Sequence, residues 1–204
     1  MSTTTSPDLS RYKVIIFNLY DALVKAFGIV PLPDRAERLA ELSTQGMQLA
    51  VASNQAGCIW RWYTGLLKFP NAGELAKNLL AIDHALGVQG LHWFISLADP
   101  RVLEKTDQQA YQAALKVISE DMIYSDDVIL NANFFHISVS ESWRKPSPDM
   151  LIAASVQLDV PVEQCLHVGD RPEDEQAARA ANMDFMWSWA LFGDDQGLGV
   201  RRVA

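Results

Sequence analysis

Short, uninterrupted apolar runs recur along the chain and alternate with segments of helical periodicity. An apolar run of strand length is typical of a strand buried on both faces of a parallel sheet. The expected strands are residues 13–17, 47–53, 91–97, one or two strands with a bend in 128–139, 165–168 and 185–190. The expected helices are residues 33–44, 71–86, 108–118, one opening at Ser147, and 171–181. This alternation predicts right-handed β-α-β crossovers and a three-layer α/β/α sandwich around a parallel, Rossmann-like sheet.

The length of 204 residues suits a single domain. We expect one domain over residues 12–191, preceded by a flexible N-terminal arm at residues 1–11 and followed by a tail at residues 192–204. Residues 98–142 are more than a minimal sheet of this kind needs, which predicts an insertion or small cap there.

Composition excludes several classes of protein. A chain with 49% hydrophobic and 21% charged residues is typical of a folded globular protein. A net charge of -8 argues against a nucleic-acid partner, which needs a concentrated basic surface. We find neither an apolar run of about 18 residues, as a membrane span requires, nor a secretory signal. We therefore expect a cytoplasmic protein whose Cys58 and Cys165 are reduced and buried.

Polar residues follow the expected strands at the points where the strands end. These segments are 18–22, 53–57, 144–148 and 169–174. Ligands of parallel sheets bind at the carboxyl ends of strands, so the segments are expected to meet. Phosphate would be bound by Ser53, Asn54 and the nearby backbone amides together with Lys145, and Mg²⁺ by Asp170 and Asp174.

Each of these side chains also has a structural interpretation. Ser53 can cap a turn, and Lys145 can be a solvated surface residue. Asp170 and Asp174 can brace loops, Asp174 near a helix N-terminus where negative charge is favourable. It is the order and spacing of the four segments that favour a binding site.

The four segments resemble the motifs of the haloacid-dehalogenase-like (HAD) superfamily. In order they read IIFNLYDA, ASNQAG, RKPSPDML and HVGDRPEDEQAARAANM, and the similarity is greatest to the small-capped subfamily III (IIIA-like) phosphatases. The resemblance covers residues 13–191 in outline. It implies that Ser53 is the phosphate-binding hydroxyl, that Lys145 steadies nucleophile and phosphate, and that Asp170 binds Mg²⁺ with support from Asp174.

The first motif departs from this family. Asn18 stands where the family has its nucleophilic aspartate, and Tyr20 where it has the general acid and base. An amide has no anionic oxygen to attack phosphorus. A phenol with a reference pKa of about 10 is poorly matched to proton transfer at neutral pH. Asp21 lies one residue beyond the acid position and is expected to point elsewhere.

Metal binding changes with the motif. In the family the cation contacts the nucleophile carboxylate, a backbone carbonyl at the second-aspartate position and the aspartate of the fourth motif. With Asn18 in place of a carboxylate, we expect weak or absent Mg²⁺ binding at Asp170 and Asp174. We expect no zinc, because no cysteine lies between Cys58 and Cys165, and we expect His136 to be a packed strand residue.

Tryptophans are a separate signal. If their segment is extended, Trp60 and Trp62 share one side and, with Arg61, form a surface typical of protein interfaces. Trp187 and Trp189 are expected to alternate on the last strand.

Three functions remain open. The favoured one is a HAD-like protein that has lost phosphoaspartate chemistry and acts as a binding or regulatory module, its partner a protein or a small molecule whose phosphate Ser53 and Lys145 hold. The alternative is an active Mg²⁺-dependent phosphohydrolase that uses Asp21 or Asp170 unconventionally. The third is a structural subunit that docks through the Trp60 and Trp62 surface.

Overall fold

The chain folds around one six-stranded sheet in which every described strand pair is parallel. The computed structural model describes residues 7–123, 130 and 134–193. The strand order is β4-β3-β2-β1-β5-β6. The strands are β1 (Val14–Phe17), β2 (Gln48–Asn54), β3 (His92–Ser96), β4 (Phe135–Ser138), β5 (Cys165–Gly169) and β6 (Asp184–Trp187). The α/β class with a parallel sheet is therefore confirmed.

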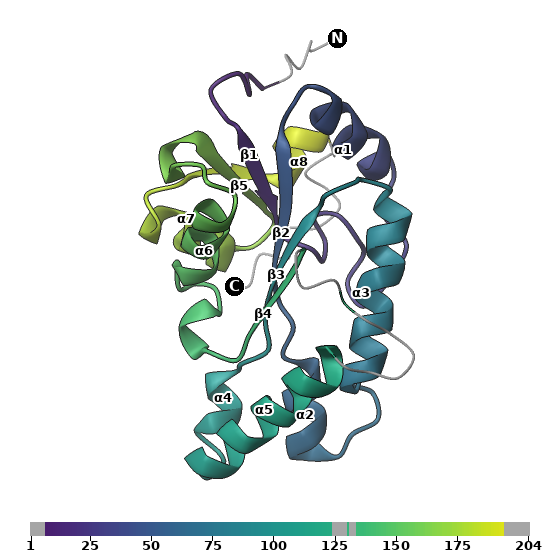
Figure 1. Cartoon of the computed structure of the whole chain (residues 1–204), viewed down its shortest axis with the longest axis vertical. Coiled ribbons are helices and arrows are strands. Elements are labelled where there is room, and N and C mark those ends of the chain that lie inside the picture. Colours follow the sequence, from purple (N-terminus) through teal and green to yellow (C-terminus); the bar gives the residue numbers. More distant parts are fainter. Residues whose placement is uncertain (1–6, 124–129, 131–133, 194–204) are drawn as a thin grey trace, which may run out of the picture.

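Helices cover both faces of this sheet (Figure 1). The pair α6 and α7 lies on one face, and α1 and α3 lie on the other. The α-helices of the described residues are α1 (Arg35–Thr44), α2 (Gly57–Thr64), α3 (Ala72–Leu86), α4 (Pro100–Leu103), α5 (Gln108–Ile123), α6 (Asp149–Gln157), α7 (Pro172–Ala180) and α8 (Ser188–Phe192). Short 3₁₀ turns are η1 (Glu141–Trp143) and η2 (Val162–Gln164). None of the helices in this part of the chain is long and apolar enough to cross a membrane.

Strand β1 shows why its sequence is apolar at every position. Ile15 and Phe17 point into the larger core, beneath α1 and α3, whereas Val14 and Ile16 point into the smaller core beneath α6 and α7. All four side chains are fully buried, since alternate residues of a strand face opposite sides and both sides are covered.

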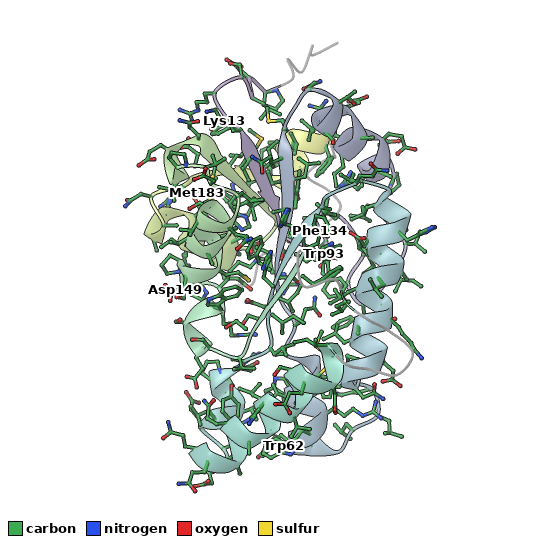
Figure 2. The ribbon with its side chains drawn as sticks, in the orientation of Figure 1. Lys13, Trp62, Trp93, Phe134, Asp149 and Met183 are labelled. Atoms are coloured by element: carbon green, nitrogen blue, oxygen red, sulfur yellow. The ribbon has the colours of Figure 1, made fainter. Side chains whose placement is uncertain are left out.

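For one pair of tryptophans the condition of the prediction is not met, and for a second pair the prediction is wrong. Residues 57–64 form helix α2, so Trp60 and Trp62 do not share one side as they would in an extended segment. The helix packs Cys58 and Ile59 inward and ends at Gly65, whose positive φ of 67° closes it. Trp60 is half-buried, and Trp62, labelled at the lower end of the molecule in Figure 2, is exposed.

At the C-terminal end of the sheet, strand β6 ends at Trp187, and residues 188–192 turn into the short helix α8. Trp189 therefore lies on a helix and does not alternate with Trp187 on one strand. The turn lets Leu191 bury its side chain in the larger core, which a straight strand would have carried away from it.

The stretch expected to be an insertion or cap serves two parts of the fold. Helices α4 and α5 pack beside α2 and α3, at the lower end of the view in Figure 1. Strand β4 then pairs with β3 at the edge of the sheet. Residues 124–129 and 131–133 lie outside the described part, as do the terminal residues 1–6 and 194–204. The boundaries of the arm, the cap and the tail stay predictions.

A buried carboxylate joins this group of helices to the loop before α6. Asp99 follows β3, is fully buried, and accepts hydrogen bonds from Trp60 Nε1 at 2.9 Å and from Arg101 Nε at 2.9 Å. The guanidinium of Arg144 lies 3.4 Å from the same carboxylate. Burial on its own would raise the pKa of Asp99, but these donors and cations lower it to about 2.

Removing this charge should weaken the fold in a pH-dependent way. We expect Asp99→Asn to lose about 3 kcal/mol of unfolding free energy at pH 7, because two guanidinium groups and an indole lose their shared anion. A depressed carboxyl pKa stabilises the fold above its unfolded value of 3.8 and stops doing so as the pH falls towards about 2.

Urea unfolding from pH 7 to pH 2 should thus show the two proteins converging below about pH 4. Asp184→Asn is the control, because the ion pair of Asp184 with Arg11 is exposed to solvent. A constant gap between wild type and Asp99→Asn down to pH 2 would contradict the assignment.

Candidate functional site

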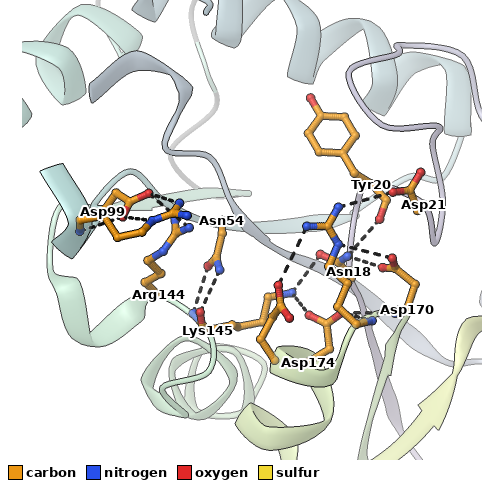
Figure 3. A network of polar contacts seen from close by, with 12 residues as sticks. Asn18, Tyr20, Asp21, Asn54, Asp99, Arg144, Lys145, Asp170 and Asp174 are labelled. Carbon is orange, nitrogen blue, oxygen red and sulfur yellow. Dashed lines mark hydrogen bonds and ion pairs between the residues drawn. The ribbon is translucent and has the colours of Figure 1, made fainter. Parts of the chain in front are cut away.

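The four predicted segments meet at the carboxyl edge of the sheet (Figure 3). Asn18 follows β1, Ser53 ends β2 with Asn54, and Asp170 follows β5. Strand β1 lies between β2 and β5, which brings these three strand ends together. Lys145, from the loop before α6, and Asp174, from the first turn of α7, complete the group.

Lys145 is at the centre of the group. Its side chain is only 2% exposed, and its ammonium has three partners. Nζ lies 2.9 Å from Asn18 Oδ1, 2.8 Å from the carbonyl oxygen of Ala52 and 2.6 Å from Asp174 Oδ1. An ammonium has three N–H donors, so all of them are used inside the protein. The interpretation of Lys145 as a solvated residue is therefore wrong.

Asn18 uses both ends of its amide. Nδ2 donates to the carbonyl oxygen of Tyr20 at 3.0 Å and to Asp170 Oδ1 at 2.7 Å, while Oδ1 accepts from Lys145. This fixes which way the amide points, because an ammonium needs an oxygen and a carboxylate needs a donor. Asn18 is buried and holds Asp170 and Lys145 together.

Asp174 is the anion that balances Lys145. Oδ1 faces the ammonium, and Oδ2 accepts from the backbone N–H groups of Asp170 at 3.2 Å and Arg171 at 3.1 Å. Burial opposes its ionisation, but Lys145 and then His167 hold the pKa of Asp174 well below its usual range. Gly169 leaves room for it, since a Cβ there would lie 2.5 Å from Cβ of Asp174.

Asp170 is in a different electrostatic environment. Burial, and then the nearby Asp174 carboxylate, raise the pKa of Asp170 to about 6, although the hydrogen bond from Asn18 opposes this. Its second oxygen lies 3.6 Å from Arg171 Nε. Arg171 also approaches Asp21 at 3.4 Å, so one guanidinium lies close to both carboxylates on the solvent-exposed side of the site.

The predicted phosphate-binding residues are occupied by protein contacts. Ser53 is buried, and its Oγ accepts from Gln55 Nε2 at 2.8 Å. The Asn54 side chain accepts from the backbone N–H of Lys145 and donates to its carbonyl oxygen, both at 3.0 Å. Asn54 thus clamps the loop before α6 to the end of β2. A role in phosphate binding stays a prediction for Ser53, Asn54 and Lys145.

The side chain at the acid and base position turns away from this network. Figure 3 shows the Tyr20 ring pointing away from Asn18 and Lys145, and its ring centroid lies 6.0 Å from that of Phe27. Burial raises the pKa of Tyr20 further above 10. Asp21, in the left-handed region with φ of 63°, directs its carboxylate to Arg171 and to the backbone of Ala26.

These residues do not fit a resident Mg²⁺ ion. The N–H group of Asn18 points at Asp170 Oδ1 and at the Tyr20 carbonyl, and a hydrogen-bond donor cannot also be a ligand of a cation. Among the residues that the structure describes, no three His, Cys, Asp or Glu side chains are grouped to hold a metal ion. Weak Mg²⁺ binding and the lack of zinc stay predictions.

The site contains residues that the sequence analysis did not single out. Arg171 lies within the fourth motif and Gln55 within the second, so membership of a motif was the available signal. His167 is fully buried, its Nδ1 2.9 Å from the carbonyl of Ile16 and its Nε2 3.7 Å from Asp174 Oδ1. Burial lowers the pKa of His167. His167 is the first residue of the fourth motif, so for it too membership of a motif was the available signal.

Removing the central ammonium should unfold the site. We expect Lys145→Met to cost about 3 to 5 kcal/mol of unfolding free energy, because Asp174 would remain as a buried, unpaired charge. The double variant Lys145→Met/Asp174→Asn should recover part of this loss, since no buried charge would remain and the amide oxygen can still accept from the two backbone N–H groups.

Chemical denaturation measures both free energies. Lys116→Met is the matched control, because its side chain is 76% exposed and its distance to Glu120 is 4.0 Å; we expect a change within about 0.5 kcal/mol. Additive effects of the two substitutions, with no recovery in the double variant, would show that the pair is not coupled.

Comparisons with known proteins agree with the arrangement of motifs. Residues 142–187 match the sequence model of the HAD-hydrolase-like family, over the third and fourth motifs. Among curated proteins, no sequence matches this chain.

Three solved structures illustrate the structural similarity. A 4-nitrophenylphosphatase from Thermotoga maritima is 13% identical, with a TM-score of 0.47 over 88% of this chain and 86% of that one. A D,D-heptose 1,7-bisphosphate phosphatase from B. bronchiseptica, complexed with magnesium and phosphate, is 16% identical, with a TM-score of 0.44 over 85% and 78%. NagD from E. coli K-12 is 18% identical, with a TM-score of 0.42 over 85% and 86%.

At these TM-scores the similarity adds no argument of its own, and the α/β architecture follows from the sheet topology. The placement in subfamily III stays a prediction. The segment from residue 142 to residue 187 is a HAD-hydrolase-like sequence, as the resemblance predicted.

Proposed function

We propose that this protein is a HAD-like binding module that does not form a phosphoaspartate intermediate. One observation carries the proposal: all three N–H donors of Lys145 and all three hydrogen-bonding contacts of the Asn18 amide are made within the protein. A phosphoryl group held by Lys145 would have to displace the Asp174 carboxylate or the Asn18 oxygen. The nucleophile position has no anionic oxygen to offer.

For the partner we propose another protein, which docks at the end of α2. Four large side chains are exposed there within six residues, namely Trp62 at 44%, Tyr63 at 39%, Leu66 at 47% and Leu67 at 79%. Exposed apolar residues that are grouped together, with aromatic members, are typical of interaction surfaces. Trp60, whose ring centroid lies 6.1 Å from that of Tyr63, is held in place because its indole N–H donates to Asp99.

The rival function is an active, Mg²⁺-dependent phosphohydrolase of a small phosphate ester, and the family match favours it. Its unconventional carboxylate would be Asp170, whose pKa of about 6 suits a group that exchanges a proton near neutral pH. The side chain of Asp170 is 17% exposed, so it is accessible from solvent.

An aryl phosphate assay separates the two functions. With 4-nitrophenyl phosphate and Mg²⁺, the binding module predicts no turnover above the protein-free rate. It also predicts no rise in melting temperature with inorganic phosphate, because a ligand that bound the folded state would stabilise it. Turnover that disappears in Asp170→Asn and persists in Asp184→Asn would establish the phosphohydrolase and overturn our proposal. Stabilisation by phosphate without turnover would support the phosphate-binding interpretation of Ser53 and Lys145.

The docking surface has a separate test. We expect proteins cross-linked to the affinity-tagged chain in its own cells to be lost from Trp62→Ser/Leu67→Ser. The same proteins should be retained by the control Val156→Ser, which removes an exposed apolar side chain (73%) elsewhere, on α6. Quantitative mass spectrometry compares the three samples. Equal recovery from all three would exclude the end of α2 as the docking surface.

A further inference from the structure

One nitrogen atom in the site has the surroundings expected of a small cation. Two oxygens converge on Asn18 Nδ2, the Tyr20 carbonyl at 3.0 Å and Asp170 Oδ1 at 2.7 Å. Carboxylate and backbone carbonyl oxygens are the ligands that Mg²⁺ prefers. In this protein the same two oxygens are satisfied by the two hydrogens of a primary amide.

The charges around this amide balance without a metal ion. Lys145 and Arg171 carry the positive charges, and Asp170 and Asp174 carry the negative ones. Lys145 pairs with Asp174 in the interior, and Arg171 approaches the second oxygen of Asp170 on the solvent-exposed side of the site. Arg171 also approaches Asp21 at 3.4 Å and Glu173 at 4.0 Å, and because all three side chains are partly exposed, solvent screens the charges of this group.

We propose that the Asn18 carboxamide is an internal substitute for a divalent cation, so that the residues of this chain do not take Mg²⁺, and the variant Asn18→Asp tests this. The proposal concerns this chain's own amide, and it rests on the first of the two functions above, because a Mg²⁺-dependent phosphohydrolase would need the ion that the amide replaces.

The consequence of Asn18→Asp follows from charge and geometry. The new carboxylate would keep an ion pair with Lys145, but its other oxygen would face Asp170 Oδ1 where a donor stood before. Two like charges at hydrogen-bond distance destabilise each other. Together with the Tyr20 carbonyl, these two carboxylates form a set of three oxygens. A hard divalent cation that binds to the set relieves the repulsion between the carboxylates.

The experiment is thermal unfolding in EDTA and in Mg²⁺ at about 10 mM, where a site filled at about 100 times its Kd gains stability by mass action. We expect the melting temperature of the wild type to be the same in both. Asn18→Asp should melt lower than the wild type in EDTA, and Mg²⁺ should raise its melting temperature by about 5 °C or more.

Two further variants make the result specific. Asn182→Asp adds the same charge at an exposed residue of positive φ, 53°, and should not respond to Mg²⁺. The exchanged pair Asn18→Asp/Asp170→Asn restores one amide and one carboxylate with their places swapped. It should fold in EDTA and show no rise with Mg²⁺. This pair also decides the case if Asn18→Asp alone fails to fold.

Several outcomes would overturn the proposal. One is a rise of the wild-type melting temperature with Mg²⁺, since the amide would then not replace the ion. Another is a folded Asn18→Asp protein that does not respond to Mg²⁺. A third is an exchanged pair that needs Mg²⁺ to fold, because charge balance would then not be what the amide supplies.

Discussion

The buried ammonium of Lys145 is the interaction on which the rest of the site depends. It takes one acceptor from the residue after β1, one from the backbone of β2 and one from the first turn of α7. An ammonium buried without partners would cost several kcal/mol, so these three elements have to be in register at once. The parallel pairing of β1 with both β2 and β5 supplies that register.

The same interaction explains why the central donors of the site are not available to a ligand. Lys145 Nζ, the Asn18 amide and the Asp174 carboxylate all have partners within the protein, and such a network is rigid, although Nε2 of the adjacent buried His167 has no hydrogen-bond partner among the described residues. Rigidity of this kind suits a scaffold that presents a surface elsewhere, such as the exposed end of α2. It suits phosphoryl transfer less well, because there a ligand must replace some of these contacts in each turnover.

Much of the fold could be predicted from the sequence, because burial leaves a pattern in it. The strands at residues 14–17 and 48–54 and the helix at residues 72–86 lie within a residue or two of their expected positions. The pattern was weaker where aromatic side chains spaced two apart suit a strand or a short helix equally. This ambiguity left the conformation of residues 57–64 open and produced the wrong conformation for Trp189.

The residues of the site could be predicted better than the contacts between them. Strand ends brought Asn18, Lys145 and Asp174 together as expected from their order along the chain. The direction of the Asn18 amide was not predictable, because it depends on which neighbour needs an oxygen. The reach of Arg171 to Asp21 depends on a left-handed backbone at Asp21, which a non-glycine residue adopts only in a particular loop.

In the loop before α6, two tasks are separate. Asn54 holds the main chain at Lys145, whereas the Lys145 side chain forms the ion pair with Asp174. Both amide contacts of Asn54 go to backbone atoms, so the path of the loop does not depend on which side chain stands at position 145. A lineage that replaced Lys145 together with its buried anion would therefore keep this backbone clamp. A lineage could lose a reaction here, keep the shape, and later acquire a different reaction on the same frame.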